Sequence, residues 1–277
     1  MQRQLLIPRM DILNSRTGSA ARGAWMAAFL FFAGAGIVFA GEPHPPAFAV
    51  RAGVEYRRAQ IQFQLHPNDP AAAWQFARAS YELNDFVTNN AGRADLAEQG
   101  IAACRQLLAR ESNSAPGHYY LAIEIGQLAD TKRNLAAFKM VREIEREFKT
   151  ADDLDEHFDY AGPARCLGLL YRDAPGWPMS IGSRHKAREW LEQAARLAPD
   201  YPENHLNLVE SFSQWKDYEA ARAELKMLDA LWPRAQTNLT GEAWERNWND
   251  WSVRREAARE KLGEISAPRK SPKDFRN

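Results

Sequence analysis

The clearest pattern of apolar and polar positions lies between residues 205 and 233. Apolar positions recur there three and four residues apart in two successive runs, which predicts two amphipathic helices joined by a short polar turn. Pro233 is expected to end the second helix, because proline lacks an amide hydrogen and clashes with the preceding turn. The positions of the two runs are His205, Leu208, Val209 and Phe212, and then Ala221, Leu225 and Leu228.

The same layout occurs in the preceding segment at a fixed period. Pro199 and Pro233 each follow a predicted helix pair, and they are 34 residues apart. Small residues recur at positions where paired helices must approach each other closely, namely Gly168, Ala187 and Ala221. The period and the small residues together resemble the tetratricopeptide repeat.

Two further helix pairs align with these two at constant offsets, one 90 residues and the other 87 residues earlier in the chain. We therefore predict an all-α fold, a right-handed α-solenoid of about four tetratricopeptide helix pairs over residues 54–233. The pairs form two two-repeat blocks, at about 70–148 and 160–233. The aligned positions are Trp74, Ala77, Tyr81, Ala97, Ile101 and Cys104, and then His118, Leu121, Ala122, Ile125, Phe138 and Val141.

Segments outside the repeats are predicted to flank and cap the solenoid. Residues 41–53 are expected to be flexible, and a leading helix is expected from Val54 to Leu65. Tryptophans at 244, 248 and 251 give residues 240–262 one apolar stripe, and the other face of this segment is charged. This is the pattern of a terminal helix that covers the last repeat and turns a polar face to water. The tail at 263–277 is predicted to be disordered.

Residues 1–40 resemble a secretory signal peptide. Arginines precede a run from Gly23 to Gly41 that has no charged residue, and Val38 and Ala40 offer the small residues that a signal peptidase reads. An uncleaved inner-membrane anchor formed by residues 24–40 is the alternative, because the run approaches the roughly 20 residues that span a bilayer. The protein is therefore expected to be exported to the periplasm or anchored facing it.

Composition and charge exclude some classes of function. The chain has 36 basic and 36 acidic residues, so no basic excess indicates a nucleic-acid partner. No catalytic or phosphate-binding motif is present, so we predict neither an enzyme nor a cofactor. An acidic segment at 152–159 is interpreted as a solvated linker, with a divalent-cation site as the less favoured alternative. Cys104 and Cys166 are predicted to be buried free thiols.

The third helix pair carries a more specific sequence than a generic repeat. It comprises Gly162-Pro163-Ala-Arg165-Cys-Leu167-Gly168-Leu-Leu-Tyr171, then Ala174-Pro175-Gly176-Trp177-Pro178-Met-Ser180-Ile-Gly182, and later Leu197-Ala198-Pro199-Asp200-Tyr-Pro202-Glu-Asn204. This segment resembles the T-component proteins of TRAP transporters over about residues 159–233. The resemblance implies a periplasmic tetratricopeptide protein that partners the substrate-binding subunit of a transporter for organic anions or apolar solutes. Such proteins commonly carry a lipid anchor on a cysteine. This sequence has no cysteine near residue 40, so it does not predict one.

The candidate binding residues lie mainly in the long turns of the first and third pairs. Insertions in solenoids tend to fall on the binding face, which favours Trp177, Pro178 and Ile181 in the turn 174–182. The other interpretation is that Trp177 and Ile181 fold back to cover the groove between the helices. Phe86 and Asn89 occupy the equivalent turn at 84–93. If the two turns share a face, they form two walls of one site.

Three further residues complete the candidate set. Tyr119 and Tyr120 are adjacent, so one of them is expected to point away from the partner helix and into the concave groove. Arg165 is included because it lies in the family-like segment.

The sequence thus predicts a non-catalytic exported binding protein, an accessory of a TRAP-type transporter that binds the solute receptor, an apolar small molecule or both. The alternative is a scaffold for another envelope protein. A homo-oligomer is compatible with either function.

Overall fold

The computed structural model describes residues 46–132 and 135–266, and every regular element in these ranges is helical. The segment interpreted as a signal peptide or anchor lies outside the described residues, as does the tail after residue 266. The chain divides into two compact units, and the boundary lies between Ala198 and Pro199. This boundary falls inside the second predicted two-repeat block.

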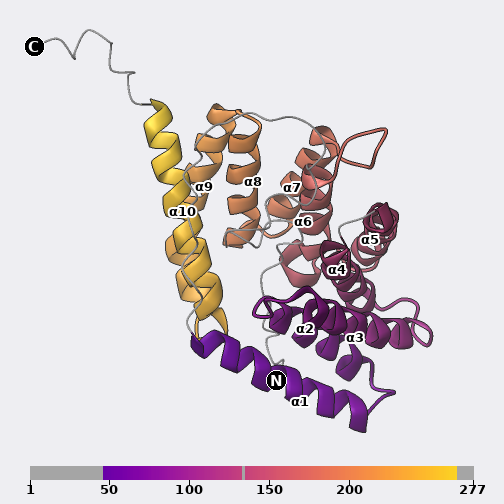
Figure 1. Cartoon of the computed structure of the whole chain (residues 1–277). Helices are drawn as coiled ribbons and strands as arrows, with labels where there is room; N and C mark the ends of the chain where they lie inside the picture. The colour runs from indigo at the N-terminus through magenta and orange to yellow at the C-terminus, as the bar shows by residue number, and fades with distance from the viewer. Residues whose placement is uncertain (1–45, 133–134, 267–277) are drawn as a thin grey trace, which may run out of the picture. The chain divides into compact units, whose positions relative to one another are not determined.

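The first unit contains seven helices among its described residues, and each packs mainly against its neighbours in the sequence (Figure 1). The predicted helix pairs are α2/α3, α4/α5 and α6/α7, and α1 packs on α2. The helices are α1 Pro46–Leu65, α2 Pro70–Asn84, α3 Asn90–Leu108, α4 Ala115–Thr131, α5 Leu135–Leu154, α6 Phe158–Asp173 and α7 Arg184–Leu197.

Side-chain caps explain why three of these helices begin where they do. The Asp69 carboxylate accepts a hydrogen bond from the Ala71 amide at 2.9 Å, and Pro70 stands at the first helical position of α2. Asn89 caps α3 through the Gly92 amide at 2.7 Å. Ser114 caps α4 in the same way. Each cap satisfies an amide that otherwise has no partner within the helix.

The small residue predicted between the helices of the third pair is required by their spacing. A Cβ atom at Gly168 of α6 would lie 2.6 Å from the Leu191 side chain of α7. Ala187 and Leu191 are fully buried at the same contact. A larger residue at position 168 would therefore force the two helices apart.

The second unit consists of one helix pair covered by a terminal helix. The pair is α8 Pro202–Gln214 and α9 Tyr218–Asn238, and a short 3-10 helix, η1 Glu242–Trp244, leads into α10 Glu245–Ser266. Helix α10 packs on both α8 and α9. Trp251 of α10 is fully buried, and its indole N–H donates to the buried Glu203 carboxylate of α8.

Arg254 fixes α10 to α8 with several charge-assisted hydrogen bonds. Its guanidinium contacts the Glu203 carboxylate at 2.6 Å and both oxygens of Glu210 at 2.6 and 2.8 Å. It also donates to the Asn207 side chain at 2.8 Å. Bidentate pairing of this kind fixes orientation as well as adding energy.

Three predicted boundaries are corrected by the structure. Helix α1 begins at Pro46, so part of the segment expected to be flexible is helical. Helix α10 continues through Ser266, beyond the predicted start of the tail. Helix α9 continues through Pro233 to Asn238. The adjacent Trp232 is buried against Trp248 of α10 and lies under the Arg255 guanidinium, 4.1 Å from the ring centre, so this part of α9 is packed against α10.

Among the described residues, no helix combines the length and the apolar character needed to cross a bilayer. Cys104 and Cys166 are both buried free thiols, as the sequence predicts.

Candidate functional site

The turn between α6 and α7 stands out from its helix pair as a closed loop (Figure 1). Its two ends are held together by backbone hydrogen bonds, from the Gly182 amide to the Pro175 carbonyl and from the Ser183 amide to the Tyr171 carbonyl, both at 2.9 Å. Within the loop, the Met179 amide donates to the Gly176 carbonyl at 3.1 Å. These bonds give the loop a defined conformation although it lies outside the helices.

Gly182 is essential to this closure. A Cβ atom at this position would lie 2.0 Å from the Ala174 carbonyl oxygen and 2.8 Å from that of Pro175. Both contacts are with backbone atoms, so a rotamer change cannot relieve them. The glycine therefore allows the two ends of the loop to meet.

The tip of this loop presents apolar side chains to solvent. Trp177 is 89% exposed and Met179 is 70% exposed. Pro178 between them is also exposed, whereas Ile181 is half-buried. Of the two interpretations of the sequence, the packing role therefore fails for Trp177, whose ring does not cover the helix pair. A large apolar side chain held in water on a hydrogen-bonded loop is typical of a binding surface.

Basic residues follow the base of this loop. Arg184, His185 and Lys186 form the exposed first turn of α7, directly after the loop. The Lys186 ammonium lies 5.0 Å from the centre of the Tyr171 ring. Burial, together with the hydrogen bond that its hydroxyl donates to Glu145, raises the pKa of Tyr171 to about 12. The loop thus combines exposed apolar side chains at its tip with basic residues at its base.

The equivalent turn of the first helix pair has a different role. Asn89 is occupied as the cap of α3, and Phe86 is half-buried. Buried Arg93 of α3 joins the end of α2 through Asn84 at 3.1 Å and contacts Asp130 of α4 at 2.8 Å. The α4/α5 pair packs between the helix pair that carries this turn and the helix pair that carries the α6/α7 loop.

The expectation that Tyr119 or Tyr120 lies open to a groove is wrong. Their exposed fractions are 1% and 2%, because both rings belong to an aromatic cluster that joins α2, α4, α5 and α6. Trp74 stacks on Tyr120 with ring centres 5.8 Å apart, and Phe158 contacts both tyrosines edge-on. Such ring packing stabilises the interior and leaves no face of either tyrosine for a ligand.

Arg165 stabilises the backbone at the start of α6. Asp159, Tyr160 and Ala161 have positive φ angles of 54°, 52° and 60°, a left-handed conformation that costs about 1–3 kcal/mol for each non-glycine residue. The fully buried Arg165 guanidinium donates to the carbonyls of Tyr160 and Asp159 at 3.0 and 3.1 Å. It also pairs with the Asp159 carboxylate at 3.1 Å, to which the Tyr119 hydroxyl donates. The geometry therefore indicates a structural role for Arg165.

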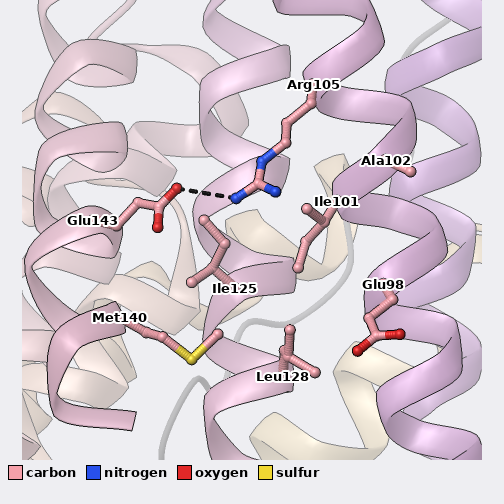
Figure 2. A pocket seen from close by; sticks show the side chains of 8 residues that line it. All are labelled: Glu98, Ile101, Ala102, Arg105, Ile125, Leu128, Met140 and Glu143. Carbon is pink, nitrogen blue, oxygen red and sulfur yellow. Dashed lines mark hydrogen bonds and ion pairs between the residues drawn. The ribbon is translucent and has the colours of Figure 1, made fainter. Parts of the chain in front are cut away.

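A cavity of about 320 Å³ lies between α3, α4 and α5. Figure 2 shows the side chains of Ile101, Ile125 and Leu128 at its apolar floor, with the Arg105–Glu143 ion pair across it at 3.3 Å. No predicted site residue lines this cavity. Helical spacing does not predict this cavity, because Ile101 and Ile125 occupy repeat positions whose side chains usually pack. The lining is completed by Glu98, Ala102 and Met140.

The acidic segment at 152–159 spans the last turn of α5, the link to α6 and the start of α6. The described residues contain no group of three or more metal-ligating side chains placed to hold an ion. Asp153, Asp155 and Glu156 are exposed, whereas Asp159 is buried against Arg165. Partial burial, followed by the charges of Asp153 and Glu156, raises the pKa of Asp152 to about 6.

Comparison with known proteins identifies the fold. No protein-family model matches the sequence, and no curated protein matches it significantly. The crystal structure of TTC0263, a thermophilic TPR protein of Thermus thermophilus, is similar, with a TM-score of 0.58 and 19% sequence identity. The match covers 77% of this chain and 93% of that chain. The predicted all-α fold is confirmed: the chain has a tetratricopeptide-repeat fold.

Proposed function

We propose that this chain is an exported, non-catalytic binding protein that engages a protein partner through the α6/α7 loop. The observation that carries the proposal is the 89% exposure of Trp177 on a loop closed by backbone hydrogen bonds. Tryptophan is among the residues that contribute most to protein interfaces, because a rigid aromatic side chain buries a large area at little entropic cost.

The chemistry of the loop indicates the kind of partner surface. Trp177 and Met179 require an apolar depression, and the basic first turn of α7 favours acidic side chains beside it. The resemblance of residues 159–233 to T-component proteins supports the solute-binding subunit of a TRAP-type transporter as this partner. A scaffold that binds another envelope protein through the same loop is the alternative.

The test removes the exposed Trp177 side chain without disturbing the fold. We expect Trp177→Ala to weaken binding of the purified TRAP solute-binding subunit by roughly 2 kcal/mol or more, which is about 30-fold in Kd. The melting temperature should stay close to that of the wild type, because an exposed side chain contributes little to stability. Biolayer interferometry and circular dichroism measure the two quantities.

Two further variants make the result specific to the loop. Met227→Ala on α9 removes another exposed methionine, 59% accessible, and should leave binding unchanged. Gly182→Ala keeps Trp177 but prevents the loop from closing, so it should also weaken binding. Equal affinity of the wild type and Trp177→Ala would exclude the loop as the site. Unfolding of Trp177→Ala would show that the residue is needed for packing.

A second candidate function, transport or storage of a small apolar molecule, is favoured by the α3/α4/α5 cavity. Its volume lies at the lower end of the range of ligand pockets, and its floor is apolar. Native mass spectrometry of the protein purified from a periplasmic extract tests this function. A bound mass that organic solvent removes, and that Ile125→Phe abolishes by filling the cavity, would support it. A clean apo mass would exclude a tightly carried ligand.

A further inference from the structure

Helix α1 presents an apolar stripe to solvent along its outer face. Val50, Val54, Ile61 and Leu65 are 67%, 47%, 52% and 66% exposed. Their spacings of four, seven and four residues place them within an arc of about 60° around the helix axis, at 100° per residue. The four side chains therefore share one face of α1, as two pairs with Arg57 and Arg58 between them in the sequence.

The opposite face of α1 is held firmly by its neighbours. Tyr56 and Phe63 both pack on the Phe76 ring of α2, with ring centres 5.6 and 5.5 Å apart. The Tyr56 hydroxyl also donates to Gln99 of α3 at 2.7 Å. Because this inner face fixes the rotation of α1, the stripe cannot turn inward to escape water.

An exposed stripe at this place needs a covering surface. Terminal helices of repeat arrays normally carry a polar outer face, because the apolar surface of the last repeat would otherwise make the protein insoluble. The outer face of α1 departs from this rule over most of its length. The departure indicates that another surface covers α1.

The charges on α1 select the kind of surface. The helix carries Arg51, Arg57 and Arg58 and one acidic residue, Glu55, which is a net charge of +2. The spacing of the stripe is symmetrical about the midpoint between Arg57 and Arg58. If α1 paired antiparallel with the same stripe of a second copy, the two-fold axis would pass through this midpoint. Each copy would then bring its arginines against those of the other, which is unfavourable. An anionic lipid surface accommodates all three arginines, whose long side chains reach the headgroups while the stripe enters the acyl region.

The position of α1 in the sequence supports the same surface. The uncharged run at 24–40, interpreted as a signal peptide or anchor, is separated from α1 only by residues 41–45. An uncleaved anchor would hold α1 at a membrane surface, and a cleaved signal peptide would release the chain at one.

We propose that α1 is a membrane-surface helix, which lies flat on an anionic bilayer with Val50, Val54, Ile61 and Leu65 inserted and its arginines at the headgroups. This role does not depend on the α6/α7 loop. It supplies membrane contact to a chain in which no lipidation cysteine is predicted.

Vesicle sedimentation tests the proposal with the chain from Gly41 to Asn277, which contains every described residue. The wild type should bind vesicles that contain equal parts of phosphatidylglycerol and phosphatidylcholine, and bind less to phosphatidylcholine alone or at high salt. Val54→Glu/Ile61→Glu places two charges in the stripe and should lower the partition coefficient by roughly tenfold or more. Arg57→Gln/Arg58→Gln should remove the preference for phosphatidylglycerol.

A matched control separates the stripe from exposed apolar residues in general. Val253 on α10 is 66% exposed and isolated, so Val253→Glu should bind vesicles as the wild type does. Circular dichroism melting confirms that each variant is folded. The proposal is overturned if the folded wild type does not sediment with anionic vesicles, or if Val54→Glu/Ile61→Glu binds them equally well. A wild-type dimer that the double substitution dissociates, without vesicle binding, would instead assign the stripe to a second copy.

Discussion

Helices α1 and α10 both end a stack of packed helices, but they differ in their outer faces. Among the described side chains of α10, Val253 is the one large apolar residue that is mostly exposed, and the exposed surface of this helix also carries charged residues such as Glu256 and Arg259. Helix α1 instead exposes four aliphatic side chains in a single stripe. A polar outer face needs only water to cover it, so the difference teaches that α10 caps its unit whereas α1 requires a further surface.

The two helices also differ in how their inner faces are attached. Helix α10 is fixed by Arg254, which bridges two glutamates, together with the buried Trp251. Helix α1 is attached mainly by Tyr56 and Phe63 packing on Phe76. A charge network is specific but fails when one partner is lost, whereas aromatic packing weakens in proportion to the area removed.

The largest expected effect follows from breaking the attachment of α10. Arg254→Met leaves the fully buried Glu203 without its guanidinium and should lower the free energy of unfolding by about 3–5 kcal/mol. Urea denaturation followed by circular dichroism measures the loss, and hydrogen exchange should show faster exchange in α8 and α10. Arg58→Met is the control on α1, since its side chain is 71% exposed and its pair with Glu55 contributes little. If Arg254→Met and Arg58→Met lost equal free energies of unfolding, the claimed difference between the attachments of α10 and α1 would be contradicted.

The next effect concerns a buried carboxyl group, that of Glu124, which has among the described residues no arginine partner like the one that Arg254 provides for Glu203. Glu124 of α4 is fully buried against Gly100 of α3, and neither carboxyl oxygen has a hydrogen bond of normal geometry to a described residue. Burial raises the pKa of Glu124 well above its ordinary value, and the nearby Tyr81 backbone offsets this only in part.

The sign of the pH dependence follows from this shift. Below the unfolded-state pKa the folded and unfolded states both hold the proton, so the stability is complete. As the pH rises above that value, the unfolded state loses its proton first and the free energy of unfolding falls until the pH passes the folded-state pKa. Glu124→Gln cannot ionise, so its free energy of unfolding should not show this fall. Parallel pH profiles of the two proteins in urea denaturation would contradict the account.

The smallest expected effect concerns the inner face of α1. Phe63→Ala removes a half-buried ring that stacks on Phe76 and should cost about 2 kcal/mol, less than a fully buried aromatic. Val54→Ala on the outer face should change the stability by less than about 0.5 kcal/mol. Thermal melts of both variants check the difference. A larger loss for Val54→Ala would mean that the stripe packs within the protein.

Helical spacing was sufficient to predict most of the fold. The 34-residue period identified the repeat, and Gly168 and Ala187 were correctly placed where the helices approach closely. The local effect of Pro233 predicts that α9 ends there, but the helix continues to Asn238. The packing of Trp232 against α10 is not visible in the local sequence. The run of left-handed residues at 159–161 has no local sequence signal, since it depends on contacts made by Arg165 and Tyr119.

The candidate site was less predictable than the fold. Proline and glycine indicated a defined turn at 174–182, but the exposure of Trp177 depends on where the turn lies relative to the helices. Helical periodicity could not tell whether Tyr119 is buried, because its neighbours come from two other helices, α5 and α6. The sequence predicts a helix from Val54 to Leu65, which leaves Val50 of the stripe outside it, and the packing of α1 on α2 decides which face is open.

Site-specific photo-crosslinking tests the central claim, partner binding by the α6/α7 loop, most directly. Trp177→benzoylphenylalanine in intact cells places the reactive group at the tip of the loop, and the same group at Met227 provides the control. The account predicts a covalent adduct with a TRAP solute-binding subunit from position 177 and none from position 227. No protein adduct from position 177, in a folded protein at its native level, would contradict it.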